Sequence, residues 1–344
     1  MPRPRAGRPV SSIPPGVAAR GALRLDASGK PSPSGSSGVI AAASAALLWG
    51  FSAALAKRFF SDEEPVPVET VTAGRTLVAA LCMAGWASLY RPGSWHVSLR
   101  DRASFLVTGM FLGLTSYTYY RAIESAGVSV GILLQYVSPF LVFLWVAWKS
   151  PRAIDARSWC ALGLILAGVF LLCWFPRAAA AGEYSRTPPP PSGVAWGLAS
   201  ACLFAAFTLR ARGAMERSSY SSFTLHAFLG AAVTGTTILA ARQLLSPIPD
   251  PGPVTSQGAL LSATIGVLGT VVPFSLYLMA VERIGPARAA AASTLEPVFG
   301  GLAAFLLTGE VPTALQAAGG AAIVLAVILL EWRRAAPATP PAAS

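Results

Sequence analysis

The sequence predicts an all-α polytopic membrane protein with ten transmembrane helices, arranged as two inverted five-helix repeats. Three observations predict this fold class. Only 12% of the 344 residues are charged, whereas about 25% is usual in soluble domains. Ten apolar stretches follow one another along the chain, each long enough for one crossing of a bilayer. The second half also repeats the first at a constant offset of 158 positions.

The first five apolar stretches each cover about 20 residues, the length that crosses a bilayer as a helix. They span residues 39–57, 70–90, 103–120, 128–148 and 158–175. The third contains Gly109-x-x-x-Gly113, a spacing typical of closely packed membrane helices. A phosphate-binding role is not indicated, because no strand precedes these glycines. The first repeat therefore covers residues 39–175.

The second five stretches span residues 193–210, 222–241, 258–279, 287–308 and 313–332, so the second repeat covers 193–332. Without a gap, Tyr119 aligns with Tyr277 and Pro139 with Pro297. Because five is an odd number, the second repeat must enter the membrane in the opposite sense to the first. Between the repeats, residues 176–192 include four consecutive prolines and predict an extended external linker.

The basic residues predict the orientation. Of 26 Lys and Arg residues, 19 fall in the tails and loops of one side, six on the other side, and Arg75 within a span. Basic residues are enriched in cytoplasmic loops, so we expect both termini to be cytoplasmic and the protein to be multi-pass in the cell inner membrane. The net charge of +11 therefore reports topology, and no nucleic-acid partner is expected.

The two ends of the chain differ from the rest. Residues 1–38 are rich in Ser, Pro and Arg and contain one acid, so they predict a disordered basic tail, with an organelle-targeting segment as the alternative. Residues 333–344 predict a second disordered tail. The four cysteines lie in apolar stretches without C-x-x-C spacing, and the two histidines are far apart. No disulfide framework, metal site or cofactor is expected.

Glu296 is the strongest candidate for a functional residue. It lies ten residues after Pro286, about 15 Å along a helix and therefore near the middle of the bilayer. A charge at that depth costs about 2.5–3.5 kcal/mol, so the side chain should face a cavity and hold a partner or a proton. One interpretation is a coupling carboxylate or an acceptor for a substrate amine. The other is a protonated Glu bonded to a carbonyl freed by Pro297. The aligned residue, Ser138, also precedes a proline but carries no charge, and this inequality favours the functional interpretation.

Six further residues complete the candidate site. Arg75 lies about 9 Å from the outer end of its span, either as a clamp for an anionic group or snorkelling toward the outer interface. Gln135 and its aligned Ser293 share a helical face with Ser138 and Glu296, as cavity residues or as interhelical donors. Three aromatic residues are expected to line a pocket or, alternatively, to pack or form interface belts: Trp49, Tyr117 and Tyr277.

Three segments resemble the drug/metabolite transporter superfamily, in its EamA-like branch: ALLWGFSAALAKR, LLQYVSPFLVF and ASTLEPVFGGLAAFLLTGE. The resemblance covers residues 39–332. It implies ten helices, cytoplasmic termini, a central cavity formed by the first four helices of each half, and peripheral fifth and tenth helices. Members move amino acids, other metabolites or drugs, often outward and in exchange for protons. In one departure, the second half has Gly309-Glu310 where the first has Pro151-Arg152.

Together these observations predict a secondary active transporter, an exporter of small metabolites such as amino acids, that works by alternating access around a midplane site. No Walker motif indicates an ATP-driven pump, and neither H-E-x-x-H nor G-x-S-x-G indicates an intramembrane enzyme. A membrane scaffold or receptor without transport is the alternative. The expected partners are the lipid bilayer and a small metabolite; protons are a candidate coupling ion and a homodimer a candidate assembly.

Overall fold

A computed structural model describes residues 33–60, 66–126, 128–150, 155–174, 190–245, 256–308 and 313–332, and all their regular elements are helical. The first part of the chain forms α1 (Pro33–Phe60), α2 (Val68–Tyr90), the 3₁₀ turn η1 (Pro92–Trp95), α3 (Leu99–Ala126), α4 (Val128–Gln135), α5 (Val137–Lys149) and α6 (Ala156–Trp174). The second part forms α7 (Pro191–Met215), α8 (Tyr220–Leu245), α9 (Ser256–Gly266), the π-helical segment η3 (Val267–Val271), α10 (Val272–Ile284), α11 (Pro286–Ser293), α12 (Glu296–Thr308) and α13 (Ala314–Trp332).

The predicted apolar stretches all coincide with helices, but several helix ends were placed wrongly. The helix α1 begins at Pro33, so residues 33–38 of the expected tail are helical. The helix α7 begins at Pro191, inside the expected linker, because proline is compatible with the first helical turn, where its missing N–H has no partner to lose. The helix α3 extends beyond the predicted 103–120, since polar residues such as Arg121 continue it past the apolar stretch. The rest of both tails and of the linker lies outside the described residues.

Local signals in the sequence explain where some helices begin. The Ser98 hydroxyl accepts a hydrogen bond from the Asp101 backbone N–H at 3.1 Å, at the start of α3. The Asp155 carboxylate accepts one from the Ser158 N–H at 2.9 Å, at the start of α6. Both satisfy donors that a first helical turn leaves unpaired. Between α10 and α11 the chain reverses through Gly285 alone, whose φ of 83° favours glycine.

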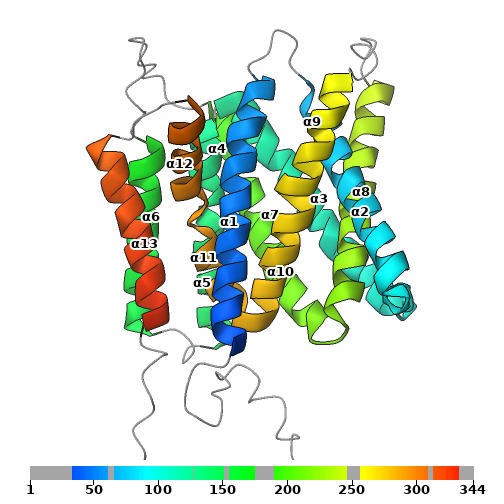
Figure 1. Cartoon of the computed structure of the whole chain (residues 1–344), viewed down its shortest axis with the longest axis horizontal. Coiled ribbons are helices and arrows are strands. Elements are labelled where there is room, and N and C mark those ends of the chain that lie inside the picture. Colours follow the sequence, from blue (N-terminus) through cyan, green and yellow to red (C-terminus); the bar gives the residue numbers. More distant parts are fainter. Residues whose placement is uncertain are drawn as a thin grey trace, which may run out of the picture.

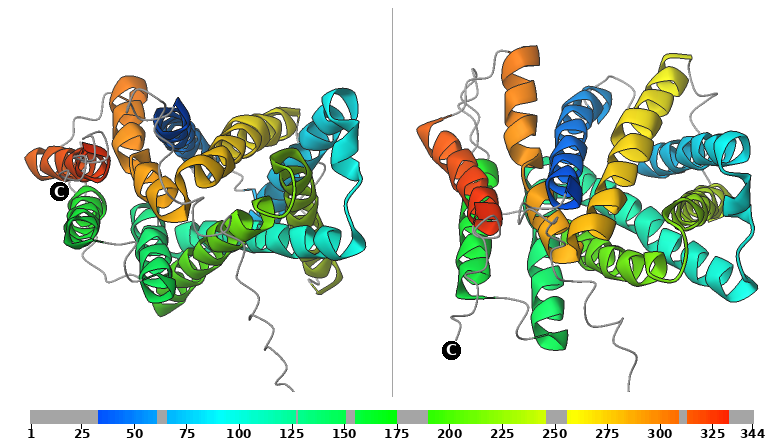
Figure 2. Two further views of the ribbon diagram at one scale, coloured as in Figure 1. Left: turned by 90° about the horizontal axis from the view of Figure 1, so that it is seen from below. Right: turned by 60° about the horizontal axis from the view of Figure 1, so that its bottom comes forward.

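The helices run side by side through the thickness of the molecule, and α1 begins at the same edge at which α13 ends (Figure 1). The helices α6 and α13 pack against each other and stand together at one end of the molecule in every view (Figure 2). They cover the predicted stretches 158–175 and 313–332, which the family resemblance placed at the periphery.

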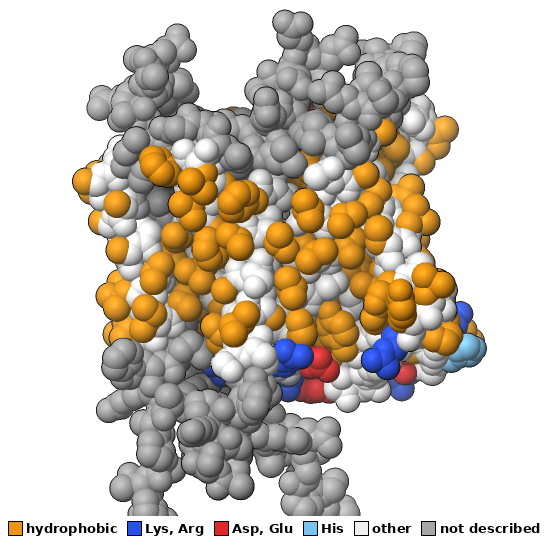
Figure 3. All heavy atoms as spheres, in the orientation of Figure 1, with side chains coloured by type: hydrophobic (Ala, Val, Ile, Leu, Met, Phe, Trp, Pro, Cys, Tyr) orange, Lys and Arg blue, Asp and Glu red, His pale blue; other side chains and the backbone are white. Residues whose placement is uncertain are grey.

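The outer surface has the pattern of a membrane protein. Figure 3 shows a broad apolar band and, at the lower edge, the charged side chains visible on this face. Four helical stretches are long and apolar enough to cross a membrane, namely Gly131–Lys149, Pro191–Met215, Tyr220–Leu245 and Ser262–Ile284. Three shorter helical stretches are also apolar: Ser36–Ser52, Ala156–Leu171 and Ala317–Leu329. The described residues therefore form an all-α, multi-pass membrane protein.

Glycines bring α3 and α8 into backbone contact. A Cβ atom at Gly109 would collide with the Ala227 carbonyl, and one at Gly230 would collide with the Leu106 carbonyl. A Cβ at Gly113 would lie 2.8 Å from the Ala231 oxygen. The close packing predicted from the Gly109-x-x-x-Gly113 spacing is therefore present, and α8 is the helix that contacts these glycines.

Two helices are interrupted at their middle. Tyr136 separates α4 from α5, and two residues, Thr294 and Leu295, separate α11 from α12. Pro139 and Pro297 lie in the first turn of the helix that follows each break. A proline cannot donate the backbone hydrogen bond that a continuous helix requires, so the chain restarts there as a new helix. The second break leaves Glu296 as the first residue of α12.

Candidate functional site

A cavity lies between the two breaks and draws its walls from both parts of the chain. Its volume is about 110 Å³. One water molecule needs about 10–15 Å³ on the same measure, so the cavity has room for a small metabolite. The lining residues are Trp49, Ser52, Arg75, Thr115, Ser116, Tyr119, Tyr120, Ile123, Ile132, Gln135, Tyr136, Ser138, Pro139, Phe204, Gly269, Phe274, Ser293 and Glu296. Six of the eight residues predicted from sequence are among them; Tyr117 and Tyr277 are not.

Glu296 lies at the cavity wall with a partner from the other break. Its Oε2 accepts a hydrogen bond from the Tyr136 hydroxyl at 3.0 Å. The charge of Arg75 also attracts the Glu296 carboxylate. The arrangement differs from the structural interpretation of the sequence, in which a protonated Glu296 bonds a backbone carbonyl, because the side chain accepts a bond from a phenol. Such a carboxylate can hold a proton or accept an ammonium group.

Three polar residues beside the breaks face the same cavity. The Gln135 Oε1 accepts a hydrogen bond from the Ser200 hydroxyl at 2.5 Å, which links α4 to α7. Ser293 donates to the Ala290 carbonyl at 2.8 Å, within its own helix. Ser138 is buried at the start of α5. Gln135 thus joins two helices as an acceptor, where the sequence suggested a donor, and it also lines the cavity.

Arg75 does not snorkel, so that interpretation is wrong. Its side chain is 7% exposed, and its guanidinium donates to three acceptors inside the protein. Nε donates to the Thr270 hydroxyl at 2.9 Å, Nη1 to the Tyr120 hydroxyl at 2.5 Å and Nη2 to the Gly269 carbonyl at 3.0 Å. Arg75 therefore ties α2 to α3 and to η3 while its charge remains at the cavity wall.

The aromatic candidates separate into different environments. Trp49 lines the cavity and packs edge-on against Phe274, with ring centroids 4.9 Å apart. Tyr277 is fully buried one turn beyond Phe274, and its hydroxyl pairs with that of Thr208 at 3.0 Å. Tyr277 therefore packs in the core, as the alternative interpretation had it.

These rings close the cavity toward the edge at which α1 begins. Phe204 and Phe274 line the cavity, while Phe207 and Tyr277 lie one turn farther toward that edge and are fully buried. On the same side, a Cβ at Gly38 would meet the Ile284 side chain at 2.6 Å. On α3 the lining reaches Ile123, three residues before the helix ends at the opposite edge. The cavity is thus placed asymmetrically between the two edges.

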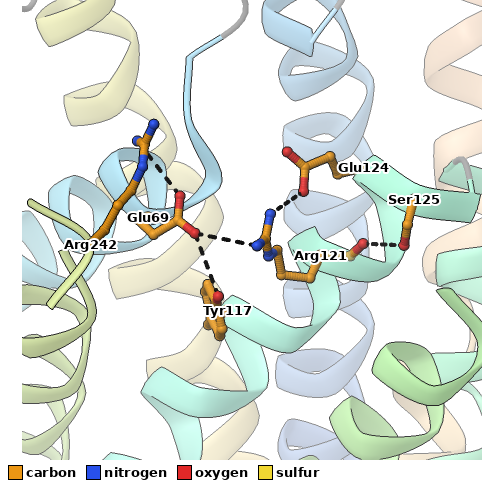
Figure 4. A network of polar contacts seen from close by, with 6 residues as sticks. All are labelled: Glu69, Tyr117, Arg121, Glu124, Ser125 and Arg242. Atoms are coloured by element: carbon orange, nitrogen blue, oxygen red, sulfur yellow. Dashed lines mark hydrogen bonds and ion pairs between the residues drawn. The ribbon is translucent and has the colours of Figure 1, made fainter. Parts of the chain in front are cut away.

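Tyr117 belongs to a charged cluster that sequence reasoning missed (Figure 4). Its hydroxyl lies 3.4 Å from Oε1 of Glu69, a buried carboxylate at the start of α2. Glu69 also pairs with Arg121 of α3 at 3.8 Å and with Arg242 of α8 at 3.7 Å. The predicted second span began one residue after Glu69, and the predicted spans 103–120 and 222–241 ended one residue before Arg121 and Arg242. The available signal was an acid directly outside one predicted span and an arginine directly outside each of two others.

His226, one of the two histidines in the sequence, is not among the described residues that line the cavity. His226 is buried and contacts the Ser222 carbonyl at 2.8 Å. Within the part of the chain that the structure describes, no group of three or more His, Cys, Asp or Glu residues is placed to hold a metal ion. Glu310 and the aligned Arg152 lie outside the described residues.

Comparison with known proteins gives consistent results. The model of the EamA-like transporter family matches residues 36–174 and again residues 191–332. An uncharacterized inner membrane transporter of Salmonella typhimurium, YicL, is 25% identical over 83% of this chain and 92% of its own length. The threonine/homoserine exporter RhtA of the same species is 24% identical over 80% of this chain and 84% of its own. A solved crystal structure shares the fold, with a TM-score of 0.70 at 17% identity over 87% of this chain and 98% of that one.

Proposed function

The chain belongs to the EamA-like transporter family, and on that premise we propose that it is a secondary active exporter of small metabolites that carry an amino group, such as amino acids. Its family and its apolar helices make it a multi-pass membrane transporter with a small-molecule substrate. The cargo, the direction and the mechanism are the proposal. The observation that carries it is the cavity in which Glu296 faces both Tyr136 and the charge of Arg75.

We take the described helices to form ten transmembrane segments, in which α4 with α5, α9 with η3 and α10, and α11 with α12 each count as one. The two family matches then correspond to two five-helix repeats, residues 39–175 and 193–332, of opposite orientation. The breaks at Tyr136 and at Thr294–Leu295 fall at aligned places in the two repeats. Broken helices that meet near the bilayer midplane are where transporters of this architecture bind substrate.

The amino group is proposed because Glu296 is the acidic residue among those that line the cavity. An ammonium group satisfies a buried carboxylate by charge and by hydrogen bonds. A proton satisfies the same carboxylate, so substrate and proton would compete for one site. Competition of this kind links outward movement of substrate to inward movement of protons when the cavity opens to each side in turn. The relative named as a threonine/homoserine exporter supports this substrate class.

The orientation is proposed from the charged residues. Lys and Arg side chains lie, together with some Asp and Glu, at the edge where α1 begins and α13 ends (Figure 3), and basic residues are expected at a cytoplasmic edge. Both termini are then cytoplasmic, and the cavity lies closer to the outside. The membrane concerned is the cell inner membrane.

Transport in proteoliposomes tests the proposal. Purified protein should take up labelled threonine into vesicles whose lumen is more acidic than the bath. Unlabelled threonine should compete, whereas N-acetylthreonine, which has the same side chain and carboxylate but no ammonium group, should not. Competition by both compounds would contradict the role of the amino group. Folded protein that moves none of a panel of amino acids and amines would instead support a scaffold or receptor without transport.

A further inference from the structure

The π-helical segment η3 contains a backbone carbonyl that has lost its usual α-helical donor. In an α-helix the Gly269 carbonyl accepts a hydrogen bond from the N–H four residues later. That residue is Pro273, which has no N–H and whose ring crowds the same carbonyl. The chain widens here into the π-helical turn Val267–Val271, which relieves the crowding. The carbonyl then needs a donor from elsewhere, because an unsatisfied polar group inside a membrane protein is costly.

Arg75 supplies this donor from the other half of the chain. Its Nη2 donates to the Gly269 carbonyl at 3.0 Å. Its Nε donates to the Thr270 hydroxyl at 2.9 Å, and that hydroxyl in turn donates to the Ile265 carbonyl at 3.3 Å. The guanidinium thus satisfies one carbonyl directly and a second through Thr270, on both sides of the widened turn.

The duplication provides an internal comparison. The residues 158 positions earlier are Phe111 for Gly269 and Thr115 for Pro273. Thr115 has an N–H, and its hydroxyl also donates to the Phe111 carbonyl at 2.7 Å. The residue 158 positions after Arg75 is Val233, on α8, the helix that packs against α3. Arg75 therefore occurs opposite the helix that contains Pro273. At the aligned position opposite α3, which has Thr115 in place of the proline, the arginine is replaced by Val233.

The widened turn forms part of the cavity. Gly269 and Phe274 line the cavity on either side of Pro273. A Cβ at Gly269 would collide with the Ser52 hydroxyl of α1, so η3 is held between α1 and α2. A shift of η3 would change the cavity wall opposite Glu296 and loosen the contact between the two halves.

We propose that Arg75 is a positioning residue for transport. It replaces the hydrogen bond that Pro273 denies to the Gly269 carbonyl, and it thereby holds η3 in the shape that completes the cavity. The expected effect on transport rests on the proposed function, whereas the positioning role itself rests on the hydrogen bonds of Arg75. It also differs from an anion clamp, because each nitrogen of the guanidinium already donates to a protein acceptor.

A suppressor experiment tests the proposal. Arg75→Gln removes the charged donors and should lower the maximal transport rate about tenfold or more, as expected for the loss of a charged hydrogen bond. The apparent KM should change less. Adding Pro273→Ala restores a backbone N–H to position 273, so the double variant should transport about threefold or more faster than Arg75→Gln, although the Arg75 charge near Glu296 stays absent. Pro286→Ala is the matched control, because Pro286 is the first residue of α11, where an N–H is not needed.

Hydrogen exchange gives a second readout that does not depend on transport. In Arg75→Gln, backbone amides of residues 266–278 should exchange faster, and Pro273→Ala in that background should slow them again. If Arg75→Gln does not fold, recovery of folding by Pro273→Ala supports the same conclusion. Three results would each overturn the proposal: unchanged exchange in Arg75→Gln, a raised KM with an unchanged maximal rate, or a double variant that is no better than the single one. If the parental protein transports nothing, the proposed function fails, while hydrogen exchange still decides the role of Arg75.

Discussion

Replacement of Glu296 by Gln should uncouple transport from the pH gradient and leave the fold intact. The side chain keeps nearly the same volume. Its carbonyl oxygen can still accept a hydrogen bond from the Tyr136 hydroxyl, which lies 3.0 Å from Oε2 in the parent. Two properties are lost: the negative charge that Arg75 attracts, and the ability to take up a proton. The substitution therefore separates proton exchange from packing.

The size of the effect follows from the titratable groups around the cavity. These are Arg75, Tyr119, Tyr120, Tyr136 and Glu296, and Glu296 is the carboxylic acid among them. At most one proton then crosses with each turnover of this site. A pH difference of one unit is worth about 1.4 kcal/mol per proton, so the parent should sustain about a tenfold substrate gradient. In the Gln variant, the substrate ratio should fall to about one.

The assay uses vesicles whose lumen is one pH unit more acidic than the bath, with labelled threonine outside and equal amounts of folded protein. Glu282→Gln is the matched control, because Glu282 is an exposed acid at the end of α10. Exchange of labelled for unlabelled substrate without a pH gradient needs no net proton movement and is expected to persist in Glu296→Gln if substrate still binds. Gradient-driven accumulation by Glu296→Gln at the parental level per folded molecule would refute proton coupling through this residue.

Three other predictions concern topology and packing. In a cysteine-free background, Ser192→Cys should react with an impermeant thiol reagent added outside cells and Ser98→Cys should not; the opposite pattern would reverse the orientation. Gly109→Ala should lower the free energy of unfolding by about 1–3 kcal/mol, because its Cβ would overlap the Ala227 carbonyl, whereas Gly85→Ala, with open space around it, should leave the thermal midpoint unchanged or slightly raised. Glu69→Gln should cost about 1–3 kcal/mol by leaving two arginines without their shared carboxylate, and an unchanged midpoint would show that the cluster does not stabilise the fold.

The helices were predictable because apolar length and charge are local properties of the sequence. The spans 128–148 and 287–308 were predicted as uninterrupted, so the two breaks were missed, although Pro139 and Pro297 were the available signal. The depth of Glu296 did indicate that its side chain faces a cavity. Helix ends were less predictable, since polar residues such as Arg121 extend a helix without contributing to hydrophobicity. The apolar pattern defines what lies in lipid, and only capping and turn residues define where a helix stops.

The partners of the polar residues could not be predicted. Arg75 bonds to Thr270 and Gly269, almost 200 residues away along the chain, and only the packing of α2 on η3 brings them together. The cluster around Glu69 likewise depends on the approach of α8 to α2. The hydrogen bonds of a side chain are set by its tertiary neighbours. From the sequence, Arg75 was therefore expected to reach the lipid interface or bind a substrate, and its bond to a backbone carbonyl was not foreseen.

The aromatic rings between the cavity and the edge at which α1 begins bear on how well the protein keeps an ion gradient intact. Phe207 and Tyr277 are fully buried, and the hydroxyl of Tyr277 is already paired with that of Thr208. A chain of water molecules needs polar partners at every step, and the rings of Phe207 and Phe274 offer none. Under the proposed proton coupling, a proton that reached Glu296 from the outside would meet these buried rings before the edge at which α1 begins. If the proposed coupling holds, this barrier would keep an idle transporter from leaking protons, and the ion gradient would be used only when a substrate molecule completes the cycle.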